Sequence, residues 1–135
     1  MKGDMKTKPY IKLSEEELNY TKMVVTAVSL TFGVSDKDVL GSCRAERIAV
    51  ARHTAYWLLR NTGMSFPRVA KALKRNCHGS SMNGYKAVED MLSLNAKDGY
   101  APLVREASKH YTGFLERFNK ARTERKIKEL ENALR

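Results

Sequence analysis

The sequence predicts an all-α fold, and three observations carry that prediction. Apolar residues recur every three or four positions along most of the chain, which is the spacing of one face of an α-helix. Serines that can cap a helix N-terminus precede these stripes, and glycines that can end a helix follow them. No segment shows the alternation of apolar and polar residues that is typical of a half-buried strand.

The first predicted helix begins after Ser14. The segment Ser14-Glu-Glu-Glu17 matches a capping box, in which the serine and glutamate side chains each satisfy the other's backbone N–H group. The apolar face of this helix comprises Leu18, Thr21, Val25, Val28 and Phe32. Gly33 ends the helix, and Ser35 then caps a short second helix that Gly41 ends.

A third helix is predicted to follow the basic link Ser42-Cys-Arg-Ala-Glu-Arg47 and to end before Gly63. Its apolar face comprises Ile48, Ala51, Ala55, Leu58 and Leu59. Tyr56 and Trp57 belong to the same helix. We assign them to the core or its edge rather than to a platform on which nucleic-acid bases stack.

Residues 65–93 form a predicted helix, short turn and helix. Ser65 can cap the first of these helices, and Pro67 fits its first turn, where backbone N–H groups lack intrahelical partners. The run Arg75-Asn-Cys-His-Gly79 interrupts the pattern and predicts the turn. The two apolar stripes comprise Phe66, Val69, Ala70 and Leu73, then Met82, Tyr85, Val88 and Leu92.

Small or polar residues lie opposite the second stripe. Ser80, Asn83 and Gly84 form this predicted outer face, with Lys86 on its flank. A short, polar helix face close to positive charge suits the major groove of DNA. The alternative is an ordinary helical hairpin with a solvated face, and the pattern alone does not decide between the two.

The chain is predicted to have three parts. These are a basic flexible tail at residues 1–13, a helix-turn-helix domain at 14–96 and a C-terminal helical extension at 97–135. The tail is either solvated or an arm that contacts DNA. The composition of 95–99 is that of a linker. The extension begins with an apolar stripe and becomes strongly charged, and that stripe comprises Leu103, Ala107, Tyr111, Phe114 and Phe118.

The charge balance favours an anionic partner. The 135 residues include 25 Lys and Arg against 15 Asp and Glu, which gives a formal net charge of +10. Nucleic acid is the first candidate for such a chain and a membrane surface is the second. No apolar run approaches the roughly 20 residues that span a bilayer. The N-terminus lacks the apolar segment of a signal peptide, so we expect a cytoplasmic, nucleoid-associated protein.

The residue patterns of common catalytic and metal sites are missing. Cys43, His53, Cys77 and His78 show no Cys-x-x-Cys or His-x-x-x-His spacing, so zinc binding is not expected. Adjacent Cys and His residues do not make a catalytic dyad, and no Gly-x-x-x-x-Gly-Lys-Ser/Thr loop exists for a nucleotide. We therefore expect no metal, no cofactor, no bound nucleotide and no enzymatic activity.

Three motifs occur in order and at matched spacing. They are Ile48-Ala-Val-Ala-Arg-His-Thr-Ala-Tyr-Trp-Leu58, Ser65-Phe-Pro-Arg-Val-Ala70 and Asn76-Cys-His-Gly-Ser-Ser-Met-Asn-Gly-Tyr-Lys-Ala-Val88. With them, residues 20–93 resemble the DNA-binding domain (domain IV) of the bacterial chromosomal replication initiator DnaA. The resemblance implies a multi-helix, Trp-repressor-like helix-turn-helix fold that binds double-stranded DNA.

The resemblance also implies roles for single residues. Arg44 matches an arginine that the family sends into the minor groove, and Arg52 and Arg60 match helix residues placed against phosphate or bases. The implied readers of the major groove are His78, Ser80 and Asn83, and backbone N–H groups at the start of the same helix would lie near a phosphate. The complete predicted set comprises Arg44, Arg47, Arg52, Arg60, Lys74, Arg75, His78, Gly79, Ser80, Asn83 and Lys86.

Several positions depart from the family's Arg-Asp-His-Thr-Thr-Val signature. The Asp is Cys77 here, the first Thr is Gly79 and the Val is Ser81, while Glu46 lies among the arginines of the basic link. Phosphate contacts position a protein on DNA, and base contacts specify the sequence that it binds. Because the positioning arginines remain and some base readers differ, we expect an altered or relaxed sequence preference.

Two functions are compatible with this reasoning. The initiator's ATPase domain is not among these residues, so the first is a stand-alone regulator of transcription or modulator of replication, of phage or mobile-element type. The second is a DNA-localised adaptor whose C-terminal helix binds a protein such as RNA polymerase or a replication factor. A homodimer through residues 101–135 is a further expectation for the same helix.

Overall fold

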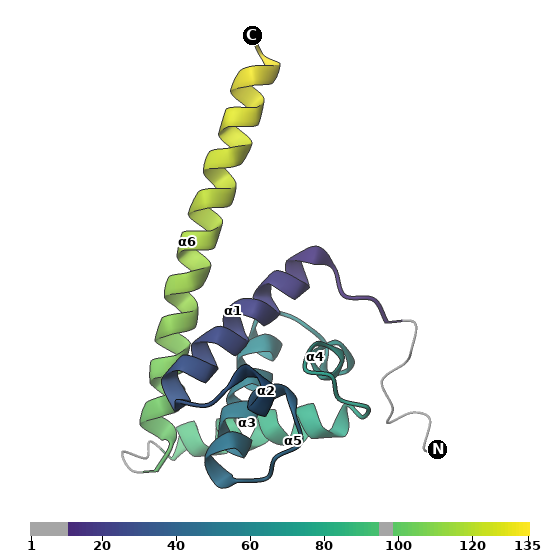
Figure 1. Cartoon of the computed structure of the whole chain (residues 1–135), viewed down its shortest axis with the longest axis vertical. Helices are drawn as coiled ribbons and strands as arrows, with labels where there is room; N and C mark the ends of the chain where they lie inside the picture. The colour runs from purple at the N-terminus through teal and green to yellow at the C-terminus, as the bar shows by residue number, and fades with distance from the viewer. Residues whose placement is uncertain (1–10, 95–98) are drawn as a thin grey trace.

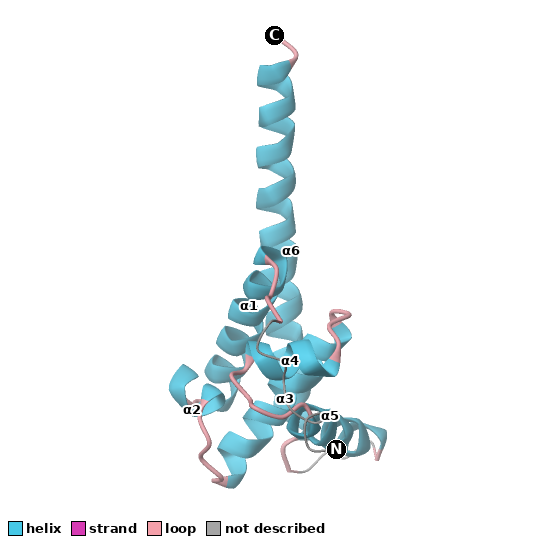
Figure 2. Cartoon of the chain, turned by 90° about the vertical axis from the view of Figure 1, so that its right-hand side faces the viewer, coloured by secondary structure: helices cyan, strands magenta, loops and turns pink. Residues whose placement is uncertain are grey.

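The computed structural model describes residues 11–94 and 99–135 (Figure 1). This part of the chain forms helices joined by short loops and contains no strand, which confirms the predicted all-α fold (Figure 2). The helices are α1 (Glu15–Phe32), α2 (Asp36–Leu40), α3 (Glu46–Asn61), α4 (Phe66–Ala72), α5 (Gly79–Ser93) and α6 (Ala101–Ala133). The predicted basic tail, except its last three residues, and most of the predicted linker lie outside the described residues.

Helix α3 lies at the centre of the molecule and packs against α1, α5 and, less extensively, α2, α4 and α6. The core side chains come from every helix. The fully buried ones include Val24, Val28, Phe32, Val39, Leu59, Val69, Leu73, Val88 and Val104. Tyr56 is buried and Trp57 is half-buried, so their assignment to the core or its edge is confirmed.

Most helix ends follow the predicted caps. The capping box of Ser14 and Glu17 is present, and Gly33 ends α1 in the left-handed conformation with φ of 66°. The Ser35 hydroxyl accepts a hydrogen bond from the backbone N–H of Asp38, as expected of the N-cap of α2. Ser65 occupies the N-cap position of α4, but its side chain makes no capping hydrogen bond. The side-chain cap predicted there is therefore wrong.

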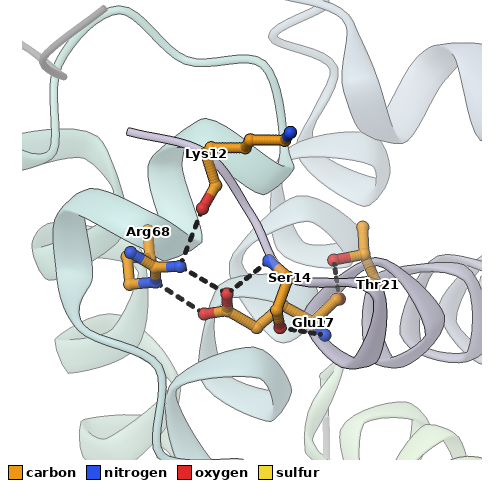
Figure 3. Close-up of polar contacts among 5 residues, drawn as sticks. All are labelled: Lys12, Ser14, Glu17, Thr21 and Arg68. Carbon is orange, nitrogen blue, oxygen red and sulfur yellow. Dashed lines mark hydrogen bonds and ion pairs between the residues drawn. The ribbon is translucent and has the colours of Figure 1, made fainter. Parts of the chain in front are cut away.

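An ion pair joins the start of α1 to α4 (Figure 3). The Arg68 guanidinium donates to both carboxylate oxygens of Glu17, from Nε at 2.6 Å and from Nη2 at 2.5 Å. The same carboxylate accepts from the backbone N–H of Ser14 at 2.8 Å. Arg68 also donates to the carbonyl oxygen of Lys12, which ties down the segment that precedes α1. Because these donors favour the ionised form, the hydrogen bond with Arg68 above all, the pKa of Glu17 falls from 4.5 to about 2.

We expect this ion pair to make the fold sensitive to acid. A carboxyl group whose pKa is lower in the folded state stabilises the fold fully above its unfolded value and loses that contribution as the pH falls. The loss should run from pH 4.5 down to about 2. Its size should be about 1–2 kcal/mol, because Arg68 is partly exposed and solvent screens the pair.

Urea denaturation at a series of pH values tests this expectation with Glu17→Gln, which keeps a capping-box side chain without the charge. The difference in unfolding free energy between wild type and variant should shrink as the pH falls through this window. A difference that is independent of pH would contradict the assigned role of the charge.

Helix α6 has two different halves. Ala101, Val104, Ala107 and Tyr111 are buried, mainly against α1, so the first half of the predicted extension completes the core. Every residue from 121 to 135 is exposed, and this half projects away from the body (Figure 1). In the described part of the chain, no helix combines the length and the apolar character that a membrane span requires.

Candidate nucleic-acid interface

The turn between α4 and α5 is built by backbone geometry. Lys74 has a φ of 60°, and the backbone N–H of Arg75 donates to the carbonyl oxygen of Ala70 at 2.8 Å. A left-handed residue followed by this bond is the pattern of a Schellman motif, in which glycine is the usual residue. The Ser81 hydroxyl then links the two helices, because it reaches the carbonyl oxygens of both Phe66 and His78.

The buried face of α5 differs from the predicted one. Gly84 is buried, whereas we predicted it on the outer face. Met82, predicted in the apolar stripe, is 44% exposed. Ser80, Asn83 and Lys86 are exposed as expected. The outer face therefore carries Met82 in place of Gly84.

The reason for this rotation is the close approach of α5 to α3. A Cβ atom added at Gly84 would lie 2.3 Å from Cδ2 of Tyr56 and 3.0 Å from Cδ2 of His53. Only glycine lets the α5 backbone pack this closely onto these rings. Burial, and then the nearby charge of Arg52, lower the pKa of His53, which favours its neutral form at this helix contact.

Arg52 is buried beside the basic link and holds that link in place. Its side chain, 8% exposed, donates from Nη2 to Asp38, from Nε to Val39 and from Nη1 to Cys43, each time to the backbone carbonyl oxygen. These oxygens belong to the last turn of α2 and to the loop that follows, where α-helical carbonyls lack intrahelical partners. Burial, and next the charge of Arg75, lower the pKa of Arg52.

Arg75 joins the turn of the helix pair to the same loop. Its Nη2 group donates to the carbonyl oxygens of Leu40, at 3.0 Å, and Gly41. The turn before α5 is thus fixed to the two residues that directly precede the basic link, although the two lie far apart in the sequence. Arg44 is the residue after Cys43 in the basic link, and it is exposed.

The other predicted basic residues differ in their exposure and in the contacts that their side chains make. Arg47 is exposed and its Nε group donates to the carbonyl oxygen of Phe32. Arg60 is half-buried, donates to the carbonyl oxygen of Met64 and lies 4.5 Å from the centre of the Phe66 ring. Lys74 is exposed. Arg60 therefore also holds the start of α4.

The predicted residues that are accessible lie at one end of the molecule. Helix α5 and the segment that leads into α3 are at the end opposite the C-terminus, as both views show (Figures 1 and 2). His78 and Gly79 are half-buried at the start of α5. The exposed members of the predicted set are Arg44, Arg47, Lys74, Ser80, Asn83 and Lys86.

Residues 21–88 match the model of a protein family described as the bacterial dnaA protein helix-turn-helix. The match covers half of the chain, from α1 to α5. The chain belongs to this family. Its helix-turn-helix is accordingly a DNA-binding domain, and the resemblance seen in the sequence is confirmed. Helix α6 lies outside the matched residues.

Sequence reasoning missed two features of this surface. Met82 was assigned to the core because it continues the spacing of Tyr85 and Val88. Arg52 was expected at the DNA surface, but its guanidinium is occupied by carbonyl oxygens. A glycine within a helix often marks the side that approaches another helix closely. This rule would have placed Gly84 on the buried face of α5 and Met82 on its exposed face.

Proposed function

We propose that this member of the family binds a specific double-stranded DNA sequence with α5 in the major groove and Arg44 in the adjacent minor groove. The observation that carries the proposal is a pair of anchors. Arg75 ties the turn before α5 to Leu40, two residues before the basic link, and Arg52 holds Cys43 within the link. Because the start of the link is held beside the turn before α5, one surface can engage two neighbouring grooves. A chain that does so acts as a transcriptional regulator or a modulator of replication.

The contacts divide into positioning and reading. Arg47, Lys74 and Lys86 are exposed cations suited to phosphates, and Arg60, half-buried in the last turn of α3, is a further candidate. The N-terminus of α5, at His78 and Gly79, offers backbone N–H groups to a phosphate. Arg52 and Arg75 act through the loop that they hold, which replaces the direct phosphate contact expected of them.

Base reading falls to the exposed face of α5. The Asn83 amide can both donate to and accept from a base edge, and Ser80 can do either more weakly. Met82 adds an apolar group that can contact a thymine methyl.

Selection of bound duplexes from a random pool at physiological salt tests the proposal. We expect one discrete motif, bound about a thousandfold better than a scrambled duplex. Asn83→Ala should change the base preferred at one position by roughly 1–3 kcal/mol. Lys74→Gly should weaken all sequences alike and lower the salt slope by about 0.9. Glycine suits the left-handed backbone there, so this control should leave the fold intact.

Two results would contradict the proposal. An unchanged preference in Asn83→Ala would remove the base-reading role. Steep salt dependence without any enriched motif would leave a non-specific DNA binder and favour the adaptor function, in which a protein partner supplies the specificity.

A further inference from the structure

We propose that the exposed half of α6, residues 119–135, pairs with the same segment of a second copy as a parallel two-stranded coiled coil. We call these residues the distal segment. They continue α6 without interruption to Ala133, yet every residue from 119 onward is exposed. Most of the stability of a helix in a protein comes from packing of its apolar face, and the distal segment buries no apolar side chain against the described part of its own chain.

An apolar stripe runs along the distal segment. Ile127, Leu130 and Leu134 are 51%, 50% and 85% exposed, and their spacing is that of a helical face. In heptad terms, Ile127 and Leu134 occupy a positions and Leu130 a d position. An isoleucine at a followed by a leucine at d favours two parallel strands. Lys120 is at the preceding a position, where a polar residue sets the register at a cost in stability.

The stripe faces away from the body. At about 100° per residue, Leu134 lies about 180° around the helix from Ala107, which is buried against α1. Arg125 lies on the side of Ala107 by the same rule and shares a hollow with Glu15 and Glu16 of α1. A second helix on the stripe therefore meets no part of the body of its own chain.

The charges beside the stripe favour a second copy of this chain as the partner, and they favour parallel over antiparallel helices. Lys126 occupies a g position and Glu131 the e position of the next heptad. In a parallel pair, each Lys126 faces Glu131 of the other copy, twice in the dimer. In an antiparallel pair, like charges would meet instead. Because the stripe from Ile127 to Leu134 spans little more than one heptad, we expect a weak dimer that DNA binding by both copies would strengthen.

Parallel pairing places both DNA-binding surfaces at the same end of a two-fold axis. This consequence rests on the proposed function, and it predicts a target with two inverted half-sites. The pairing itself can be measured without DNA. Failure of one hypothesis is thus distinguishable from failure of the other.

Sedimentation equilibrium of the full chain over a concentration series tests the pairing. Wild type should self-associate, Lys126→Glu should weaken association about tenfold, and adding Glu131→Lys to it should restore the wild-type level. Lys128→Glu makes the same change of charge at a b position and should have little effect. Helix content by circular dichroism is followed for each variant. A monomeric wild type, or a charge-swapped variant that stays weak, would overturn the proposal and leave the stripe for another protein.

Disulfide trapping checks the direction. In a Cys43→Ser, Cys77→Ser background, Leu130→Cys should form a covalent dimer with oxidised glutathione, because d residues of parallel strands face each other. Asn132→Cys, on the outer face, should not. Equal trapping of both would exclude the parallel arrangement. Lys126→Glu should bind a duplex with a single site as well as wild type does. If wild type itself failed to bind that duplex, the proposed function would be refuted, but the proposed pairing would not.

Discussion

Replacing Arg52 with methionine is expected to lower the free energy of unfolding by about 3 kcal/mol. The guanidinium satisfies the carbonyl oxygens of Asp38, Val39 and Cys43, and methionine keeps much of the volume while removing every donor. Buried acceptors without partners carry a desolvation cost, and the last turn of α2 would loosen. We also expect DNA affinity to fall, because the link that carries Arg44 would lose its position.

Urea denaturation of Arg52→Met beside Arg44→Met measures this effect. Arg44 is exposed, so its variant should unfold within about 0.5 kcal/mol of wild type and lose affinity for DNA only. Equal stability of the two variants would show that the carbonyl contacts contribute little. A stable Arg52→Met with reduced affinity and an unchanged loop would instead support the direct phosphate contact first expected from the sequence.

Gly84→Ala should destabilise the protein by about 2 kcal/mol, although alanine is the better helix former. The added methyl group would lie 2.3 Å from the Tyr56 ring, which is buried and cannot move into solvent. Helix α5 must therefore shift away from α3, and its outer face would no longer match the groove. Thermal unfolding and affinity for the selected duplex should both register the change.

Gly113→Ala in α6 is the matched control. A Cβ atom there meets nothing closer than Nη1 of Arg117 at 3.8 Å, so the usual gain for alanine over glycine in a helix, about 0.5–1 kcal/mol, should appear. The two variants make the same chemical change in helices and should move stability in opposite directions. Destabilisation of both by the same amount would mean that the contact with Tyr56 is not the cause.

Local rules predicted the helices well, because caps and apolar spacing act within a few residues. Ser14 with Glu17, and Gly33 after Phe32, set the bounds of α1 in the sequence and in the structure alike. The rotation of α5 could not be predicted in this way. A glycine looks polar or small in a pattern, yet Gly84 is buried because two rings from α3 fit against it.

The site was predictable as a region but less so as a set of roles. The motifs of the family placed the basic link, the turn and α5 together, and the match over residues 21–88 agrees with them. The role of Arg52 depends on carbonyl oxygens that a separate loop brings around it, which no spacing rule encodes. The DNA contacts of the exposed residues, Asn83 foremost, stay predictions.

The continuity of α6 has a mechanical consequence. The same helix supplies Val104, Ala107 and Tyr111 to the core and extends beyond it to Ala133. Because the helix is continuous, no hinge separates its exposed half from the half that packs on α1 and α3. A change in the direction of the exposed half is therefore transmitted to the core. A partner that binds the exposed half of α6 therefore also constrains the angle at which the opposite end of the molecule approaches its target.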